Sequence, residues 1–250
     1  MPNSSEFSGK IAVVTGGTMG LGRHLTQTLT EAGADVFFCG QRETLGRQAA
    51  DAMGPQAHFV ACNLADAAQT QAFIHAAGEF RGHIDYLINN AATDPRIELA
   101  TATVDEFDKL IAVNLRSFFV ATQGALPYLQ AGQGKAIVNI CTTNYMLGLA
   151  PFTIYNASKS GIVGFTRSLA REMGPLGIRA NVLSPGWIMT EKQLREHVTE
   201  KDKQELLDAQ SLKFLLTEED VTPATLFLLS QAARGITGQN LVVDGGKVMY

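Results

Sequence analysis

Short apolar runs alternate with helical patterns along almost the whole chain, and this alternation restricts the folds that the chain can adopt. The runs are KIAVVTGG, DVFFCG, AHFVACNL, IDYLINNA, KAIVNICT, IRANVLSPG and NLVVDGG. Strands that are apolar throughout are buried on both faces, which is typical of a parallel sheet covered by its crossover helices. The sequence therefore predicts a doubly wound α/β fold with a parallel sheet of about seven strands flanked by helices.

The chain is expected to form a single domain over residues 1–250. No repeat or low-complexity linker divides its 250 residues, and 24 glycines suit a fold with many tight turns. Residues 104–129 are predicted as one long helix, and a later helix is predicted to begin near Thr222, with Pro223 in its first turn.

Charge and cysteine usage exclude several classes of protein. The formal charge is −4 and the 20 Lys and Arg residues form no basic stripe, which argues against nucleic acid as a partner. No apolar run is long enough to span a membrane, and the polar start MPNSSEFSGK lacks the apolar segment of a signal peptide. Three widely spaced cysteines indicate neither disulfides nor a metal site and fit a reducing cytoplasm.

The glycine-rich turn TGGTMGLG, at residues 15–22, follows the first strand and precedes a helix. Glycines allow the backbone to approach a pyrophosphate closely, and the helix N-terminus adds unpaired N–H groups. No Gly-Lys-Ser/Thr follows, so the turn is not a P-loop. It predicts a Rossmann-type dinucleotide site lined by Gly16, Thr18, Met19, Gly20, Leu21 and Gly22.

The end of the second predicted strand bears on the choice between NAD and NADP. An acid is expected there to bind the ribose hydroxyls, but Gly40 occupies the position and Asp35 lies before the strand. Nothing there would repel a 2′-phosphate, and Arg42 would attract one, so NADP is slightly favoured over NAD. Gln41 is not basic, and Arg42 also reads as a solvated charge at a helix start, so both cofactors stay open.

Tyr155 and Lys159, in the stretch IYNASKSG, are four residues apart. On a helix this spacing places both side chains on one face. An isolated pair of this kind usually marks only a surface helix with an exposed lysine. A functional pair would instead bring an ammonium close to a phenol that acts as an acid or a base.

Five motifs at characteristic spacing resemble the short-chain dehydrogenases/reductases: TGGTMGLG, NNAA at 89, VNL around Asn114, YNASK and SPGWIMT at 184. The resemblance implies an NAD(P)-dependent oxidoreductase whose catalytic tetrad is Asn114, Thr142, Tyr155 and Lys159. The family has Ser where this chain has Thr142, and Thr143 is the alternative hydroxyl if the strand end bulges.

The resemblance also implies a role for each site residue. Tyr155 would be the acid/base, with its pKa lowered by Lys159 together with the positive nicotinamide ring. Lys159 would also bind the nicotinamide ribose. Thr142 would hold the substrate oxygen, and Asn114 a water beside Lys159. The remaining cofactor contacts would come from Asn63, Leu64, Asn90, Ile188 and Thr190.

The charged segment at about 188–215 is expected to be a substrate lid. A pocket lined by Asn144, Tyr145, Trp187, Gln193 and also Gln210 would suit a polyhydroxylated ligand, since hydroxyl groups need fixed partners and an aromatic face stacks on C–H groups. PGWIMTEKQ and AQSLK are similar to the aldose 1-dehydrogenases of the family, which oxidise a sugar to its lactone. A ketone or 3-oxoacyl reductase and a non-catalytic NAD(P)-binding regulator are the alternatives.

The resemblance further implies a homotetramer. The fourth and fifth helices and the apolar segment 241–250 would form the contacts between subunits. The sequence contains neither G-x-S-x-G nor H-E-x-x-H, which argues against serine hydrolase and zinc protease chemistry.

Overall fold

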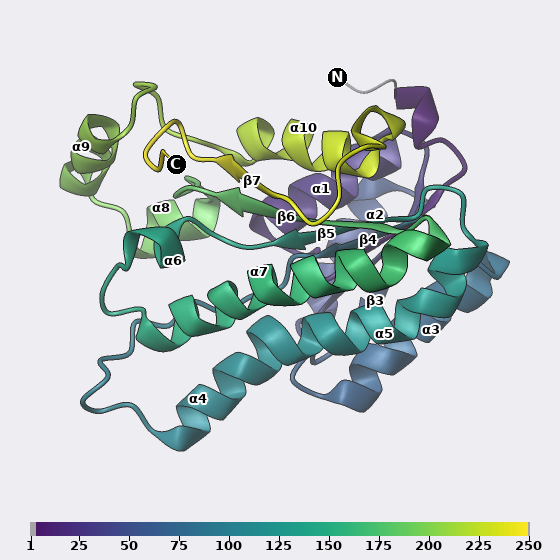
Figure 1. The fold of residues 1–250 in the computed structure, drawn as a ribbon, viewed down its shortest axis with the longest axis horizontal. Helices are drawn as coiled ribbons and strands as arrows, with labels where there is room; N and C mark the ends of the chain where they lie inside the picture. The colour runs from purple at the N-terminus through teal and green to yellow at the C-terminus, as the bar shows by residue number, and fades with distance from the viewer. Residues whose placement is uncertain (1–3, 250) are drawn as a thin grey trace.

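A computed structural model describes residues 4–249 of the protein, so residue 250, at the end of the expected subunit contact, lies outside it (Figure 1). One sheet of seven parallel strands runs through the molecule in the order β3-β2-β1-β4-β5-β6-β7. This confirms the predicted doubly wound α/β fold. The strands are β1 (Ile11–Val14), β2 (Asp35–Gly40), β3 (Ala57–Ala61), β4 (Tyr86–Asn89), β5 (Ala136–Ile140), β6 (Arg179–Pro185) and β7 (Asn240–Val243).

Helices connect successive strands and cover both faces of the sheet. The α-helices are α1 (Gly20–Glu31), α2 (Glu43–Met53), α3 (Ala67–Arg81), α4 (Val104–Ile111), α5 (Ser117–Ala131), α6 (Asn144–Leu147), α7 (Thr153–Met173), α8 (Glu191–Glu196), α9 (Glu200–Ala209) and α10 (Glu218–Leu229). Short 3₁₀ segments lie at Ser4–Glu6, Gly174–Leu176 and Gln231–Ala233, and a π-helix, η2, spans Ala112–Arg116. Within the described residues no helix is both long and apolar enough to cross a membrane.

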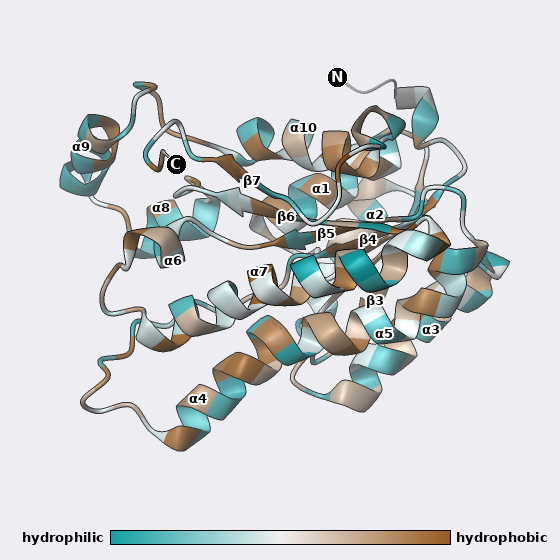
Figure 2. Cartoon of the chain, viewed as in Figure 1, coloured by the Kyte–Doolittle hydropathy of each residue, from teal (hydrophilic) through white to brown (hydrophobic). Residues whose placement is uncertain are grey.

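The side chains of alternate strand residues pack into two separate apolar cores, one on each face of the sheet. In β1, Ala12 and Val14 pack with α1, α2 and α10 on one face. Ile11 and Val13 face α3, α5 and α7 on the other. Both kinds of position are fully buried, which is why these strands are apolar throughout rather than alternating. Figure 2 shows the apolar strands enclosed between helices, with α9 mostly hydrophilic.

Two helix predictions were wrong. Residues 104–129 do not form one regular helix, because η2 interrupts it between α4 and α5. The last helix begins at Glu218 instead of near Thr222, so Pro223 lies inside it. The start is fixed by the Asp220 carboxylate, which accepts a hydrogen bond from the Thr217 N–H at 2.8 Å.

The strand order places the candidate site. The chain runs outward from β1 to β2 and β3, then returns to β4 on the other side of β1. Ligands of open α/β sheets bind at the carboxyl ends of the strands where this reversal occurs. The loops after β1 and β4 meet there.

Candidate functional site

The glycine-rich turn after β1 forms a cradle with no room for side chains. A Cβ atom added at Gly22 would lie 2.2 Å from the Gly16 carbonyl oxygen, and Gly16 has a φ of +70°. The amide of Asn90 donates hydrogen bonds to the carbonyls of Thr15 and Gly16 at 3.0 and 3.2 Å. Asn90 therefore holds the turn in shape from the loop after β4.

A cleft of about 560 Å³ lies over this turn. It is lined by Gly16, Thr18, Met19, Gly20, Leu21, Gly22, Leu64, Asn90 and Thr190, all predicted, and by others including Cys62 and Lys192, which the sequence analysis missed. The start of α1 borders this cleft with three glycines, Gly16, Gly20 and Gly22, and unpaired backbone N–H groups at a helix N-terminus are the partners that a pyrophosphate requires. The residues present therefore fit a nicotinamide dinucleotide.

Asn63 does not line this cleft, although Leu64 beside it does. The Oδ1 atom of Asn63 accepts hydrogen bonds from the Gln41 amide at 2.9 Å and from the Ala65 N–H at 3.1 Å. These contacts engage the side-chain oxygen of Asn63, and its expected contact with the cofactor stays a prediction.

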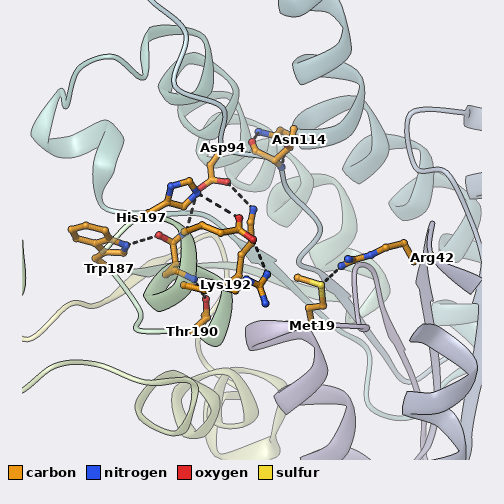
Figure 3. Close-up of polar contacts among 12 residues, drawn as sticks. Met19, Arg42, Asp94, Asn114, Trp187, Thr190, Lys192 and His197 are labelled. Carbon is orange, nitrogen blue, oxygen red and sulfur yellow. Dashed lines mark hydrogen bonds and ion pairs between the residues drawn. The ribbon is translucent and has the colours of Figure 1, made fainter. Parts of the chain in front are cut away.

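The outer edge of the cleft is basic. Gly40 ends β2, and the guanidinium of Arg42, two residues later, contacts the sulfur of Met19 (Figure 3). An adjoining hollow of about 630 Å³ is lined by Met19 and Arg42 and by three further cations, Arg23, Lys192 and Arg195, against the acids Glu191 and Glu218. Arg23 lies one residue beyond the glycine motif, which is why motif matching missed it.

Tyr155 and Lys159 are one turn apart on α7, and both are buried, so the surface-helix interpretation does not hold. The Lys159 ammonium lies 5.7 Å from the centre of the Tyr155 ring and 5.8 Å from that of Phe118. It donates a hydrogen bond to the Ile140 carbonyl, at the end of β5, at 3.1 Å. The strand end thus fixes the cation beside the phenol.

The pKa values of the pair move in opposite directions. Burial raises the pKa of Tyr155 well above that of an ordinary phenol, and the charge of Asp94 raises it further, while a hydrogen bond with Thr142 lowers it. Burial lowers the pKa of Lys159. In the protein without cofactor, removing the phenol from water therefore sets the direction of the Tyr155 pKa shift. The lowering expected from Lys159 together with the nicotinamide ring stays a prediction.

Thr142, and not Thr143, shares a pocket with Tyr155 and Lys159. Its hydroxyl accepts a hydrogen bond from the Asn144 N–H at 3.2 Å, and Thr143 instead lines a neighbouring pocket. The strand end does not move Thr143 into the place of Thr142.

Asn114 is fully buried within η2. Its amide nitrogen donates to the Thr93 carbonyl at 2.8 Å and to the Ser158 hydroxyl at 3.3 Å, and its oxygen accepts from the Thr93 N–H at 2.8 Å. Both amide protons are thus engaged, so this side chain ties the loop after β4 to α7. π-helices are frequent at functional sites.

Ile188 and Thr190 follow β6 and line the same pocket as Tyr155. The Thr190 hydroxyl accepts a hydrogen bond from the Gln193 N–H at 3.2 Å and so caps α8. The residues that would hold a nicotinamide amide therefore also start the expected lid.

A pocket next to the tetrad contains three of the five residues predicted to line the substrate pocket, Asn144, Trp187 and Gln193. The Trp187 indole donates to the Gln193 amide oxygen at 2.9 Å, and the Gln193 nitrogen donates to the Asp94 carboxylate at 3.4 Å (Figure 3). Asp94 and Gln193 line both this pocket and the one that holds Tyr155. Sequence analysis missed Asp94, although it lies two residues after the NNAA motif.

Two predicted substrate residues lie elsewhere. Tyr145 packs against the cluster around Phe118 and Val182, and its hydroxyl accepts a hydrogen bond from the Asn240 amide at 3.0 Å. Gln210 is buried and donates to the carbonyls of Leu212 and Phe214 at 3.1 and 2.9 Å. Neither residue lines the pocket beside the tetrad, and a substrate contact for either one stays a prediction.

Known proteins resemble this chain over nearly its whole length. The family model described as "Enoyl-(Acyl carrier protein) reductase" matches residues 16–247. The "Probable galactose dehydrogenase GalD" of Rhizobium meliloti (strain 1021) is 34% identical over 94% of this chain and 93% of its own. The "D-xylose 1-dehydrogenase" of Caulobacter vibrioides is also 34% identical, over 96% of both chains.

A crystal structure has the same fold. It is that of a "putative short-chain alcohol dehydrogenase" from Sinorhizobium meliloti 1021, 30% identical in sequence, with a TM-score of 0.90. The match covers 97% of this chain and 98% of that one.

Proposed function

The chain belongs to the short-chain dehydrogenase/reductase family and is an NAD(P)-dependent oxidoreductase, and we propose that it is an aldose 1-dehydrogenase that oxidises a cyclic sugar to its lactone. One observation carries the choice of substrate. Asp94, Gln193, Asn144 and Trp187 bring a carboxylate, two amides and an indole together beside Tyr155. Such a set suits a ligand with many hydroxyl groups, because each hydroxyl needs a partner.

The names of two relatives, a probable galactose dehydrogenase and a D-xylose 1-dehydrogenase, support a sugar substrate. A dry acyl pocket would instead leave the Asp94 carboxylate and the two amides facing apolar groups, which costs free energy.

The cofactor supplies the redox chemistry: when bound, its oxidised nicotinamide ring accepts the hydrogen of the anomeric carbon together with the electron pair of that C–H bond. The chain's own residues handle the proton. Tyr155 takes the proton of the anomeric hydroxyl as the C=O bond of the lactone forms. Thr142 orients that oxygen by a hydrogen bond, and the Lys159 ammonium offsets the negative charge when Tyr155 is ionised.

Gly16, Gly20 and Gly22 would hold the pyrophosphate, Ile188 and Thr190 the nicotinamide amide, and Lys159 the adjacent ribose. For the phosphate-bearing end we propose NADP ahead of NAD. The support is the absence of an acid at Gly40, together with the cations Arg23 and Arg42 on the adjoining surface.

We propose that residues 188–215, containing α8 and α9, form a lid over the substrate. The support is that Thr190 and Gln193 lie at its beginning and also line the pocket of Tyr155. Closure would exclude water from the reacting groups.

A homotetramer is proposed with α4, α5 and the C-terminal segment at the contacts. Apolar side chains that are exposed in the single chain support it: Val104 and Phe107 on α4, Phe119 on α5, and Met249. Light scattering of the purified protein would give a mass near 107 kDa, about four times the 26.8 kDa of one chain.

We also propose a reducing compartment, the cytoplasm, because all three cysteines are free thiols.

The deciding experiment follows absorbance at 340 nm with NADP or NAD and a panel of aldoses, ketones and 3-oxoacyl thioesters. Formation of the reduced cofactor with an aldose supports the proposal. Turnover of ketones or 3-oxoacyl compounds alone would indicate the reductase alternative. Cofactor binding without turnover of any alcohol or carbonyl compound would indicate a regulator.

A further inference from the structure

Three basic side chains line the substrate pocket on the side that does not contain Tyr155. Arg96 comes from the loop after β4, His197 from the end of α8, and Lys247 from the C-terminal segment. None of them lines the pocket that Tyr155 shares with Lys159. The substrate site therefore has a reacting end and a separate basic end.

Carboxylates compensate the positive charge of this end only in part. The His197 Nε2 atom lies 3.9 Å from the Glu196 carboxylate, and the charge of Arg96, after the hydrogen bonds with Thr199, lowers the pKa of Asp202. Asp94 is the one acid lining the pocket, and it already faces the Lys192 ammonium at 3.8 Å and the Gln193 amide. Among residues 4–249, neither Arg96 nor Lys247 forms an ion pair through its side chain. The Arg96 guanidinium lies over the ring of Phe152, 5.9 Å from its centre.

Lys247 is held in place by its own backbone. The buried carboxylate of Asp244 accepts hydrogen bonds from the N–H groups of Gly246, Lys247 and Val248 at 2.9, 3.2 and 2.8 Å. The C-terminal segment is thus folded tightly around one carboxylate, and the half-buried Lys247 lines the pocket from a fixed position. A site that is fixed in advance binds a ligand with a smaller loss of conformational entropy.

We propose that the basic end binds an anionic group, and that the preferred aldose carries a negative charge at the end farthest from its anomeric carbon. This deepens the proposed function and rests on it. A guanidinium and an ammonium bind carboxylates and phosphates through charge-assisted hydrogen bonds, whereas a neutral CH₂OH group satisfies neither charge. Asp94 and Gln193 would bind hydroxyls in the middle of the sugar.

Binding can be measured without turnover, because Trp187 is the only tryptophan of the chain and lines this pocket. Its fluorescence is titrated with galactose, galacturonate and galactose 6-phosphate, using the full-length protein saturated with NADPH, which cannot accept a hydride and so prevents oxidation of the probes. These probes share their stereochemistry and differ only at C6. We expect an anionic probe to bind about 10-fold more tightly than galactose, with a preference that weakens as salt is added.

The two anionic probes distinguish the sources of the charge. Tighter binding of galacturonate assigns the site to a carboxylate, and tighter binding of galactose 6-phosphate assigns it to a phosphate. Equal binding of all three probes would overturn the proposal, as would tighter binding of galactose.

Variants test which residues create the preference. Arg96→Gln and Lys247→Gln are each expected to lower the ratio of anionic to neutral affinity about 2–5-fold, the range for single exposed ion pairs. The control is Arg47→Gln. Arg47 is an exposed cation on α2, with 71% of its side chain accessible, and it lines none of the pockets described above. If the ratio does not change in Arg96→Gln and Lys247→Gln, the basic end does not recognise charge.

The two proposals fail in different ways. Turnover of galactose at least as fast as galacturonate, with no difference in affinity, leaves the aldose dehydrogenase standing and removes the anionic subsite. Preferential binding of an anionic probe without oxidation of any aldose retains the subsite and removes the proposed reaction.

Discussion

The Lys159 ammonium lies 5.7 Å from the centre of the Tyr155 ring, and it is held there by the carbonyl of Ile140 at 3.1 Å. The pair is buried, so the position of the cation is set by a strand end and not by solvent. Its charge acts on the phenol through a medium of low dielectric constant, where electrostatic effects are stronger than in water. The proposed proton transfer depends on this arrangement.

Replacing Tyr155 with Phe removes the hydroxyl and leaves the ring in its packing against Phe152 and Leu110. We expect kcat to fall about 10²–10⁴-fold, the usual contribution of an acid/base group, with little change in cofactor affinity. Steady-state rates at 340 nm and quenching of Trp187 fluorescence by cofactor measure the two effects. A variant that retained more than a tenth of the wild-type rate would exclude Tyr155 as the acid/base.

The raised pKa of Tyr155 predicts the direction of the pH dependence. Since burial stabilises the neutral phenol, the ionised form becomes more abundant only as the pH rises. Sugar oxidation, which needs the ionised form, should therefore become faster with increasing pH, and the reverse reaction, which needs the proton, should become slower. In the cofactor-free protein, the absorbance change at 295 nm that is lost in Tyr155→Phe should occur above the ordinary phenol pKa of about 10.

Asp94→Asn tests the acid that sequence analysis missed. The Asp94 charge raises the pKa of Tyr155, so its removal should lower that pKa and move the pH profile of oxidation to lower pH. The same change weakens the contact with Gln193, so KM for the sugar should increase. An unshifted pH profile, measured as kcat/KM between pH 6 and pH 10, would show that Asp94 does not act on Tyr155.

Arg42→Ala tests the preference for NADP. If the guanidinium binds the 2′-phosphate, its removal should weaken NADP binding about 10-fold and leave NAD binding nearly unchanged. Arg47→Ala, on the same helix but paired with Glu43 at 2.6 Å, is the matched control. The ratio of kcat/KM for the two cofactors is the measurement, and a constant ratio would assign Arg42 to the solvated surface.

Gly22→Ala tests the cradle of the cofactor. The new methyl group would lie 2.2 Å from the Gly16 oxygen and 2.5 Å from the Asn90 amide nitrogen, so the turn has to open. We expect cofactor affinity to be lost and the free energy of unfolding to fall by about 1–3 kcal/mol. Gly235→Ala, where a Cβ meets nothing within 4 Å, is the control. Thermal unfolding with and without cofactor separates the two effects.

Local patterns were sufficient for the sheet and for the central pair of the site. Buried strands are apolar on both faces and helical neighbours recur at fixed spacing, so β1, the glycine turn after it, and the pairing of Tyr155 with Lys159 were predictable from short stretches. Helix boundaries were harder to predict. The hydrogen bond between Thr217 and Asp220 starts α10 before Pro223, although a proline is typical of the first turn of a helix.

The sequence by itself determined the order of strands and helices, the glycine cradle and the spacing of the proposed acid/base pair, since each depends on residues close together in the chain. Only the tertiary structure decided that Asp94, Arg96 and Lys247 share one pocket with Trp187, that Tyr145 turns away from it, and that the pKa of Tyr155 is raised. The physical reason is that burial and charge act through space, and the groups responsible lie up to 153 positions apart in the sequence.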